Sequence, residues 1–133
     1  MPSLKFRYSV YRDISVPIIP VQLEGDGWHE VWTYVDSGAS YSILKVQEAE
    51  RLGIDIYSGK EQMITVGDGS LIPVYLHKLN VRLGEREFEA TIGFSDRLGI
   101  GFNILGRKDF FDRFVFCFDD YHRELSLTEI EKV

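Results

Sequence analysis

Short runs of alternating apolar and polar residues, separated by turn residues, recur along most of this chain. The stretch LKFRYSV, residues 4–10, is the first of them, and its period of two gives a strand one apolar face. Turn residues follow at 25–27, 67–69 and 84–85, and again at 119–122, each between two apolar runs. This spacing predicts a mainly β fold, a barrel or a sandwich of about seven or more strands.

Only two segments favour a helix over a strand. KVQEAERLG, residues 45–53, has good helix formers and ends at a glycine, and RKDFFDRF, residues 107–114, is a shorter candidate. No linker, repeat or low-complexity tract interrupts the chain, and 133 residues is the size of one domain. We therefore expect a single domain over residues 1–133, with one or two short helices.

The composition narrows the classes of function. The chain is 44% hydrophobic and 27% charged, and the charges interrupt every apolar run, so we expect it to fold in water with no membrane partner. A net charge of -6 and the lack of a basic stripe argue against nucleic-acid binding. The first residues, MPSLKFRYSVYRD, lack the apolar core of a signal peptide, which favours a cytoplasmic location.

Metal and cofactor chemistry finds little support in the residues. Cys117 is the only cysteine, so the chain has neither an intrachain disulfide nor a thiolate cluster, and the three histidines share no metal-like spacing. Neither a phosphate-binding glycine loop nor a serine nucleophile elbow is recognisable. We predict no metal and no cofactor. Cys117 lies among aromatic residues in FVFCFD, and we predict it to be a small buried hydrophobic residue.

Asp36 is the most informative residue, because it directly follows the apolar stretch EVWTYV and precedes the small residues SGAS. One interpretation is a turn cap, since Asp and Ser side chains bond their own backbone two residues on and glycine permits a tight turn. The other is a loop that brings a carboxylate into a dry, crowded place. Small residues there let backbone or another chain come close.

Two motifs together resemble one protein family. Asp36-Ser37-Gly38-Ala39-Ser40 resembles the active-site loop of the retropepsin-like aspartic proteases, Asp-Thr/Ser-Gly-Ala-Ser/Thr after a hydrophobic strand. Residues 102–114 are similar to the family's second signature, two apolar residues and a glycine, here Ile104-Leu105-Gly106, before a short C-terminal helix. Gly67-Asp68-Gly69 falls where the family carries its flap. The resemblance extends over about residues 15–128 and implies a closed β-barrel of the retropepsin type.

The resemblance also implies an activity, aspartic endopeptidase, and a peptide or protein substrate. Peptide hydrolysis by such an enzyme uses two carboxylates that share one proton, one acting as general base toward water. This chain has one Asp followed by Ser/Thr-Gly, so the second catalytic acid has to be Asp36 of another copy. A homodimer with one Asp36 per subunit is therefore part of the expected mechanism.

The roles of neighbouring residues follow from the same resemblance. Ser37 would bond the partner's loop, Gly38 would let the backbone approach the carboxylates, and Ala39 would stay small beneath the substrate. Ser40 would bond Asp36 from behind. The segment Ile104-Leu105-Gly106 would pack against the loop, and Gly67-Asp68-Gly69 would cover the bound peptide. Candidate specificity residues are Val66, Ile72 and Phe102.

Two alternatives stay open at this point. The same fold could serve as a non-catalytic peptide- or protein-binding module, since a fold alone does not fix a function. An acid in an apolar site argues against it, because an isolated ionised carboxylate is costly there. The second alternative is a monomeric β-barrel in which Asp36 is only a turn residue.

Overall fold

The computed structural model describes residues 3–99 and 101–131, and these are mostly β-strand. The strands are β1 (Ser3–Arg7), β2 (Ser9–Tyr11), β3 (Ile14–Val16), β4 (Ile18–Gly25), β5 (Gly27–Val35), β6 (Ser42–Lys45), β7 (Lys60–Thr65), β8 (Leu71–Leu83), β9 (Arg86–Ser95), β10 (Asn103–Leu105), β11 (Phe114–Asp119) and β12 (Glu124–Glu129). The helices are α1 (Val46–Leu52) and the short 3-10 helix η1 (Ile56–Ser58). The predicted mainly β class is confirmed, and no helix in the described ranges is long and apolar enough to cross a membrane.

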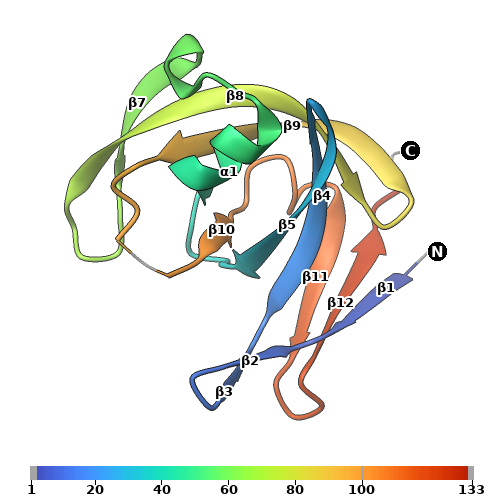
Figure 1. Cartoon of the computed structure of the whole chain (residues 1–133). Coiled ribbons are helices and arrows are strands. Elements are labelled where there is room, and N and C mark those ends of the chain that lie inside the picture. The colour runs from blue at the N-terminus through green and yellow to red at the C-terminus, as the bar shows by residue number, and fades with distance from the viewer. Residues whose placement is uncertain (1–2, 100, 132–133) are drawn as a thin grey trace.

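The main sheet has seven strands in the order β4-β5-β10-β6-β9-β8-β7 (Figure 1). The short strand β10, from late in the chain, lies between two early strands, parallel to β5 and antiparallel to β6. Strand β4 also pairs with β8, through Gln22 with Arg82 and Leu23 with Val81. This order places the residues after β5 and those after β10 at the same end of the sheet. Closure of the sheet into a barrel stays a prediction.

Strand β5 illustrates how the sequence positions the site. Val31, Thr33 and Val35 are buried, whereas the residues between them face outward or are partly covered. The one buried polar residue of this strand, Thr33, donates its hydroxyl hydrogen bond to the Ile19 carbonyl at 3.2 Å. Burial of alternate side chains sets the register of the strand, since a slip of one residue would expose the whole apolar face. The position of the next residue, Asp36, is set with it.

A second sheet of three strands, ordered β1-β12-β11, covers one side of the core (Figure 1). Its inward residues Leu125 and Leu127 are fully buried, and Phe114 of β11 and Phe110 from the turns before β11 pack in the same cluster. Strands β2 and β3 form a separate small hairpin. The predicted strand over residues 4–10 is therefore divided at Tyr8, since β1 pairs with β12 whereas β2 pairs with β3.

Helix α1 lies within the predicted segment 45–53 and ends as predicted. Gly53 has a left-handed φ of 71°, and its amide donates to the Glu50 carbonyl. The predicted helix at 107–114 is wrong, since the segment forms successive turns. The reason lies at Asp109, whose φ of 69° breaks the helical path while its carboxylate accepts a 2.8 Å bond from the Thr91 amide.

The prediction for Cys117 is also wrong, because its side chain is exposed. Strand β11 buries Phe114 and partly buries Phe116, so the period of two puts Cys117 on the opposite, outward face. Its aromatic neighbours Phe114 and Phe116 lie on the inward face of the strand. Sequence proximity to aromatic residues was therefore a poor guide to burial here.

Candidate active site

Asp36 stands at the end of β5 and begins a tight turn. The Gly38 amide donates to Oδ1 of Asp36 at 2.8 Å, and the Ala39 amide donates to the Asp36 carbonyl at 3.2 Å. The first of these bonds is the one that the turn-cap interpretation predicts. Asp36 is half-buried, and its Oδ2 accepts no hydrogen bond from the residues that the structure describes. One carboxylate oxygen is thus fixed by the loop and the other is left for a further group.

The last residue of β10 and the residues after it hold this loop through backbone hydrogen bonds. The Asp36 amide donates to the Leu105 carbonyl at 3.0 Å, and the Arg107 amide donates to the Ala39 carbonyl at 2.9 Å. A third bond, also 2.9 Å, runs from the Lys108 amide to the Ser40 carbonyl. Two segments about 70 residues apart in the sequence are therefore joined along the length of the loop. The loop conformation depends on this pairing as well as on its own turn.

Gly106 lies at the closest approach of the two segments. It is buried, and a Cβ atom built on it would overlap the Tyr41 carbonyl group and the Ala39 carbonyl oxygen. Its amide donates to the Ser42 hydroxyl at 3.0 Å. Only glycine leaves room for this contact. The reason is space and not backbone conformation, because the φ of Gly106 is not positive. Ile104 and Leu105 are buried just before it.

The sequence analysis did not identify Ser42 as a site residue, although its buried hydroxyl accepts the hydrogen bond from Gly106 where the two segments meet. The available signal was a lone Ser in the apolar stretch YSIL, which needs a hydrogen-bond partner once buried. Ser40, by contrast, is exposed, and its carbonyl accepts the hydrogen bond from the Lys108 amide. Ser37 and Gly38 are exposed too, whereas Ala39 is half-buried. The loop therefore presents its tip to solvent and its base to the core.

The hairpin between β7 and β8 contains the predicted flap residues at its tip. The Gly69 amide donates to the Val66 carbonyl at 2.8 Å, and Gly69 has a φ of 86°, which favours glycine. Asp68 accepts hydrogen bonds from the hydroxyl and the amide of Ser70. These bonds, the hydroxyl first, lower the pKa of Asp68. The charge at the tip is thus satisfied within the turn itself, while Gly67 is exposed and has open space around it.

An apolar cluster connects this hairpin with the strand that follows the Asp36 loop. Its buried members are Ile43, Ile72 and Val74, and its partly buried members are Tyr41, Ile64, Val66, Leu76 and Leu98. The side-chain amide of Gln62, on β7, also donates to the Tyr41 hydroxyl at 3.4 Å. Val66 and Ile72, two of the three candidate specificity residues, belong to this cluster. Phe102 lies elsewhere, with its ring centroid 4.6 Å from that of Tyr11 and 5.1 Å from that of Tyr34.

The family model described as aspartyl protease matches residues 19–106. This range is about two thirds of the chain and contains the Asp36 loop, the β7–β8 hairpin and the Ile104-Leu105-Gly106 segment. The chain belongs to the aspartyl protease family. This protease is therefore an aspartic-type endopeptidase, a hydrolase, and the predicted family is confirmed.

Solved structures show that the fold of this protease is retropepsin-like. A retropepsin-like aspartic protease from Rickettsia conorii is similar to it with a TM-score of 0.67 and 22% identity, over 95% of this chain and 91% of that chain. EIAV protease complexed with the inhibitor HBY-793 is similar with a TM-score of 0.54 and 22% identity, over 74% of this chain and 88% of that chain. A search of curated proteins gave no significant match.

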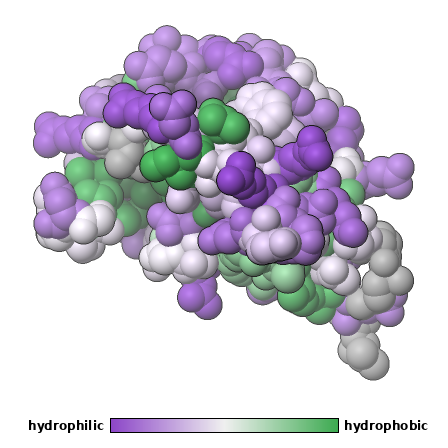
Figure 2. Space-filling model, turned by 90° about the horizontal axis from the view of Figure 1, so that it is seen from below, coloured by the Kyte–Doolittle hydropathy of each residue, from purple (hydrophilic) through white to green (hydrophobic). Residues whose placement is uncertain are grey.

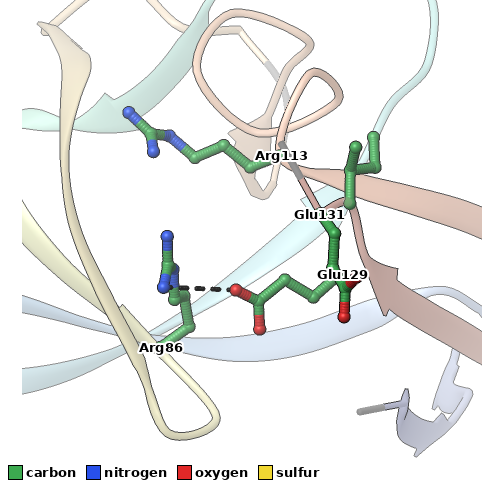
Figure 3. Close-up of a pocket in the computed structure, with 5 residues that line it drawn as sticks. Arg86, Arg113, Glu129 and Glu131 are labelled. Carbon is green, nitrogen blue, oxygen red and sulfur yellow. Dashed lines mark ion pairs between the residues drawn. The ribbon is translucent and has the colours of Figure 1, made fainter. Parts of the chain in front are cut away.

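The protease also has a pocket of about 360 Å³ to which the Asp36 loop contributes no residue (Figure 3). It is lined by Arg86, Arg113, Glu129, Ile130 and Glu131. Arg86 and Glu129 form an ion pair of 3.2 Å, and the guanidinium of Arg113 lies 4.8 Å from the Phe88 ring centroid. Within the described ranges, no group of three or more His, Cys, Asp or Glu side chains could hold a metal ion. Because no residue of the Asp36 loop lines this pocket, the pocket is not part of the candidate active site.

Proposed function

We propose that the protein is a homodimeric aspartic endopeptidase in which the Asp36 carboxylates of two copies form the catalytic dyad. One observation carries the proposal: the sequence has a single Asp-Ser-Gly, in a loop clamped against the core with one carboxylate oxygen left unbonded by the described residues. Aspartyl proteases hydrolyse peptides with two carboxylates that share one proton. A second copy of the chain would supply the second carboxylate, its own Asp36.

The dyad would act through one shared proton. Two carboxylates about 3 Å apart do not both ionise, so one stays protonated while the other is a base. The ionised Asp36 takes a proton from water, which attacks the peptide carbonyl carbon, and the protonated Asp36 donates a hydrogen bond to the carbonyl oxygen. Collapse of the tetrahedral intermediate then breaks the C–N bond as the amine takes up a proton from the dyad, which returns the dyad to its state with one shared proton. Activity is expected from acid to near-neutral pH and lost above about pH 9.

The residues of this chain would prepare that reaction by holding atoms in place. The Gly38 amide fixes Oδ1 of Asp36, so Oδ2 is the oxygen that faces the partner and the water. The hydrogen bonds from the Asp36 amide to the Leu105 carbonyl and from the Arg107 amide to the Ala39 carbonyl fix the loop backbone, which limits the reorganisation needed during the reaction. Ser37 is exposed at the loop tip, where its hydroxyl is free to bond the partner's loop. Each role is one of positioning, apart from that of Asp36 itself.

The substrate is proposed to be an extended peptide that pairs in β fashion beneath the flap. The cluster around Ile43, Ile72 and Val74 lies between the flap strands and the strand after the loop. Its partly buried members, such as Ile64 and Val66, would contact apolar substrate side chains. Gly67 and Gly69 give the tip freedom to close. Asp68 does not oppose closure strongly, since the hydrogen bonds from Ser70 already stabilise its charge.

A peptide-library assay with molar mass followed by light scattering tests the proposal. Wild type, Asp36→Asn and the exposed control Asp96→Asn are each measured over a dilution series. We expect cleavage by wild type and the control, none by Asp36→Asn, and a turnover that falls faster than linearly on dilution. A stable dimer that cleaves no peptide would instead support the binding module. A monomer at all concentrations would exclude the shared dyad and favour the turn-cap role of Asp36.

A further inference from the structure

Arg113 has a donor group that no described part of the chain satisfies. Its Nε atom is buried, and among residues 3–99 and 101–131 it is the one buried side-chain nitrogen or oxygen without a hydrogen-bond partner. Such atoms are nearly always paired in folded proteins, because an unmade hydrogen bond in the interior is costly. Exposed apolar area is a weaker guide to a further site here, since apolar and hydrophilic patches are mixed over the lower face of the molecule (Figure 2). An arginine that breaks the pairing rule is therefore the stronger indication of a site.

The guanidinium of Arg113 is held in place by packing. It lies over the Phe88 ring, 4.8 Å from the ring centroid, and Phe88 is itself buried beside Phe110 and Phe114. The Arg113 carbonyl accepts a 2.9 Å hydrogen bond from the Ile130 amide, which fixes the backbone at the root of this side chain. A guanidinium that is already stacked loses less conformational freedom when a ligand binds.

A second guanidinium faces the same pocket. Arg86 and Phe88 are two residues apart on β9, so their side chains point to one face of the strand. Arg86 already has a partner, Glu129, whereas within the described ranges Arg113 forms no ion pair. In Figure 3 both guanidinium groups lie on one side of the pocket and Glu131 lies on the other. One positive charge on the pocket wall is thus left unmatched by these residues.

We propose that this pocket binds the C-terminal carboxylate of a peptide that ends in an apolar residue. The two Nη groups of Arg113 would donate parallel hydrogen bonds to the two carboxylate oxygens, the geometry that a planar guanidinium favours. Ile130, which is 39% exposed, would contact the apolar side chain of the ligand. Each peptide bond that the enzyme hydrolyses leaves one new α-carboxylate, so its own reaction supplies ligands of this class.

The charge of the pocket favours a carboxylate over a phosphate. Two arginines and two glutamates line it, and the ion pair of Arg86 with Glu129 neutralises one of each. A monoanion then matches Arg113, whereas a phosphate monoester, with a charge of about −1.5 to −2, would meet Glu131 with its excess charge. No residue of the Asp36 loop lines the pocket, so the inference goes beyond the proposed function and does not depend on a shared dyad.

The first test uses the wild-type chain and two ligands that differ in one group. N-acetyl-leucine carries a carboxylate where N-acetyl-leucinamide carries a neutral amide. In an NMR titration, the acid should shift the signals of the Arg113 side chain and the Phe88 ring to saturation, and the amide should not. Acetate lacks the apolar side chain, so its dissociation constant should be at least about tenfold higher.

The second test removes the guanidinium. Arg113→Gln should raise the dissociation constant of N-acetyl-leucine at least about tenfold, because charge-assisted hydrogen bonds are lost. The matched control is Arg7→Gln, at an exposed arginine of β1, and it should bind the acid as wild type does. If Arg113→Gln does not fold, the comparison of acid with amide in the wild-type chain still decides the question.

Three results would overturn the proposal. They are equal shifts, or none, with the acid and the amide; shifts centred on the Asp36 loop instead of Arg113; and wild-type affinity in folded Arg113→Gln. Acetate that binds as tightly as N-acetyl-leucine would also exclude a peptide end and leave a simple anion site. None of these results bears on the catalytic dyad, which the Asp36→Asn assay tests separately.

Discussion

Replacement of Gly106 by alanine should lower both the stability and the activity of the enzyme. The new Cβ would overlap the carbonyls of Tyr41 and Ala39, so the two segments would have to separate by a distance of the order of 1 Å. Four hydrogen bonds cross this contact, three between backbone groups and one to the Ser42 hydroxyl. At about 0.5–1.5 kcal/mol each, their loss would cost about 2–6 kcal/mol. A 1 Å displacement of Asp36 would also lower activity by roughly 100-fold.

Two assays check this reasoning on Gly106→Ala, chemical denaturation for the free energy of unfolding and peptide cleavage for kcat/KM. The control is Gly99→Ala, because a Cβ at this exposed glycine meets no atom within 4 Å and its φ is not positive. We expect the control to match wild type in both assays. Wild-type stability together with wild-type kcat/KM in Gly106→Ala would refute the argument, since it would mean that the loop is not held by close packing at this point.

Three further predictions concern the flap and the core. Ser70→Ala removes the hydroxyl bond to Asp68, so the pKa of Asp68 should rise toward its ordinary value of 3.8, as followed by NMR titration. Since that pKa is lowered in the folded chain, the associated stabilisation of the tip is present above pH 3.8 and lost as the pH falls through the folded pKa. Asp109→Ala leaves the Thr91 amide without its partner and places alanine at a positive φ, so denaturant titration should show a loss of about 1–3 kcal/mol. Phe110→Ala empties a fully buried site and should cost about 3–5 kcal/mol in the same assay; a loss below about 1 kcal/mol in either variant would contradict the packing described.

The predictions that succeeded all depend on neighbours in the sequence. The alternation in β5, the turn at 67–69 and the helix ending at Gly53 are local patterns, and each appears in the structure at or near its predicted place. The predicted helix at 107–114 failed because of a distant contact, since Asp109 leaves the helical region where its carboxylate meets the Thr91 amide. The prediction for Cys117 failed for a local reason. Its aromatic neighbours do not indicate burial, because the period of two places Cys117 opposite the face of Phe114 and Phe116.

For the site, the sequence alone determined the chemical groups. It supplied one Asp-Ser-Gly after an apolar strand, an Ile-Leu-Gly segment late in the chain, and a glycine-rich turn between them. Only the tertiary structure decided that β10 enters between β5 and β6, which brings Gly106 against Tyr41 and buries Ser42 as a hydrogen-bond partner. The physical reason is range. Side-chain alternation and turn chemistry act over a few residues. The Asp36 loop, by contrast, is held only when strands about 70 residues apart in the sequence pair in one register. That pairing leaves no room for a side chain at Gly106.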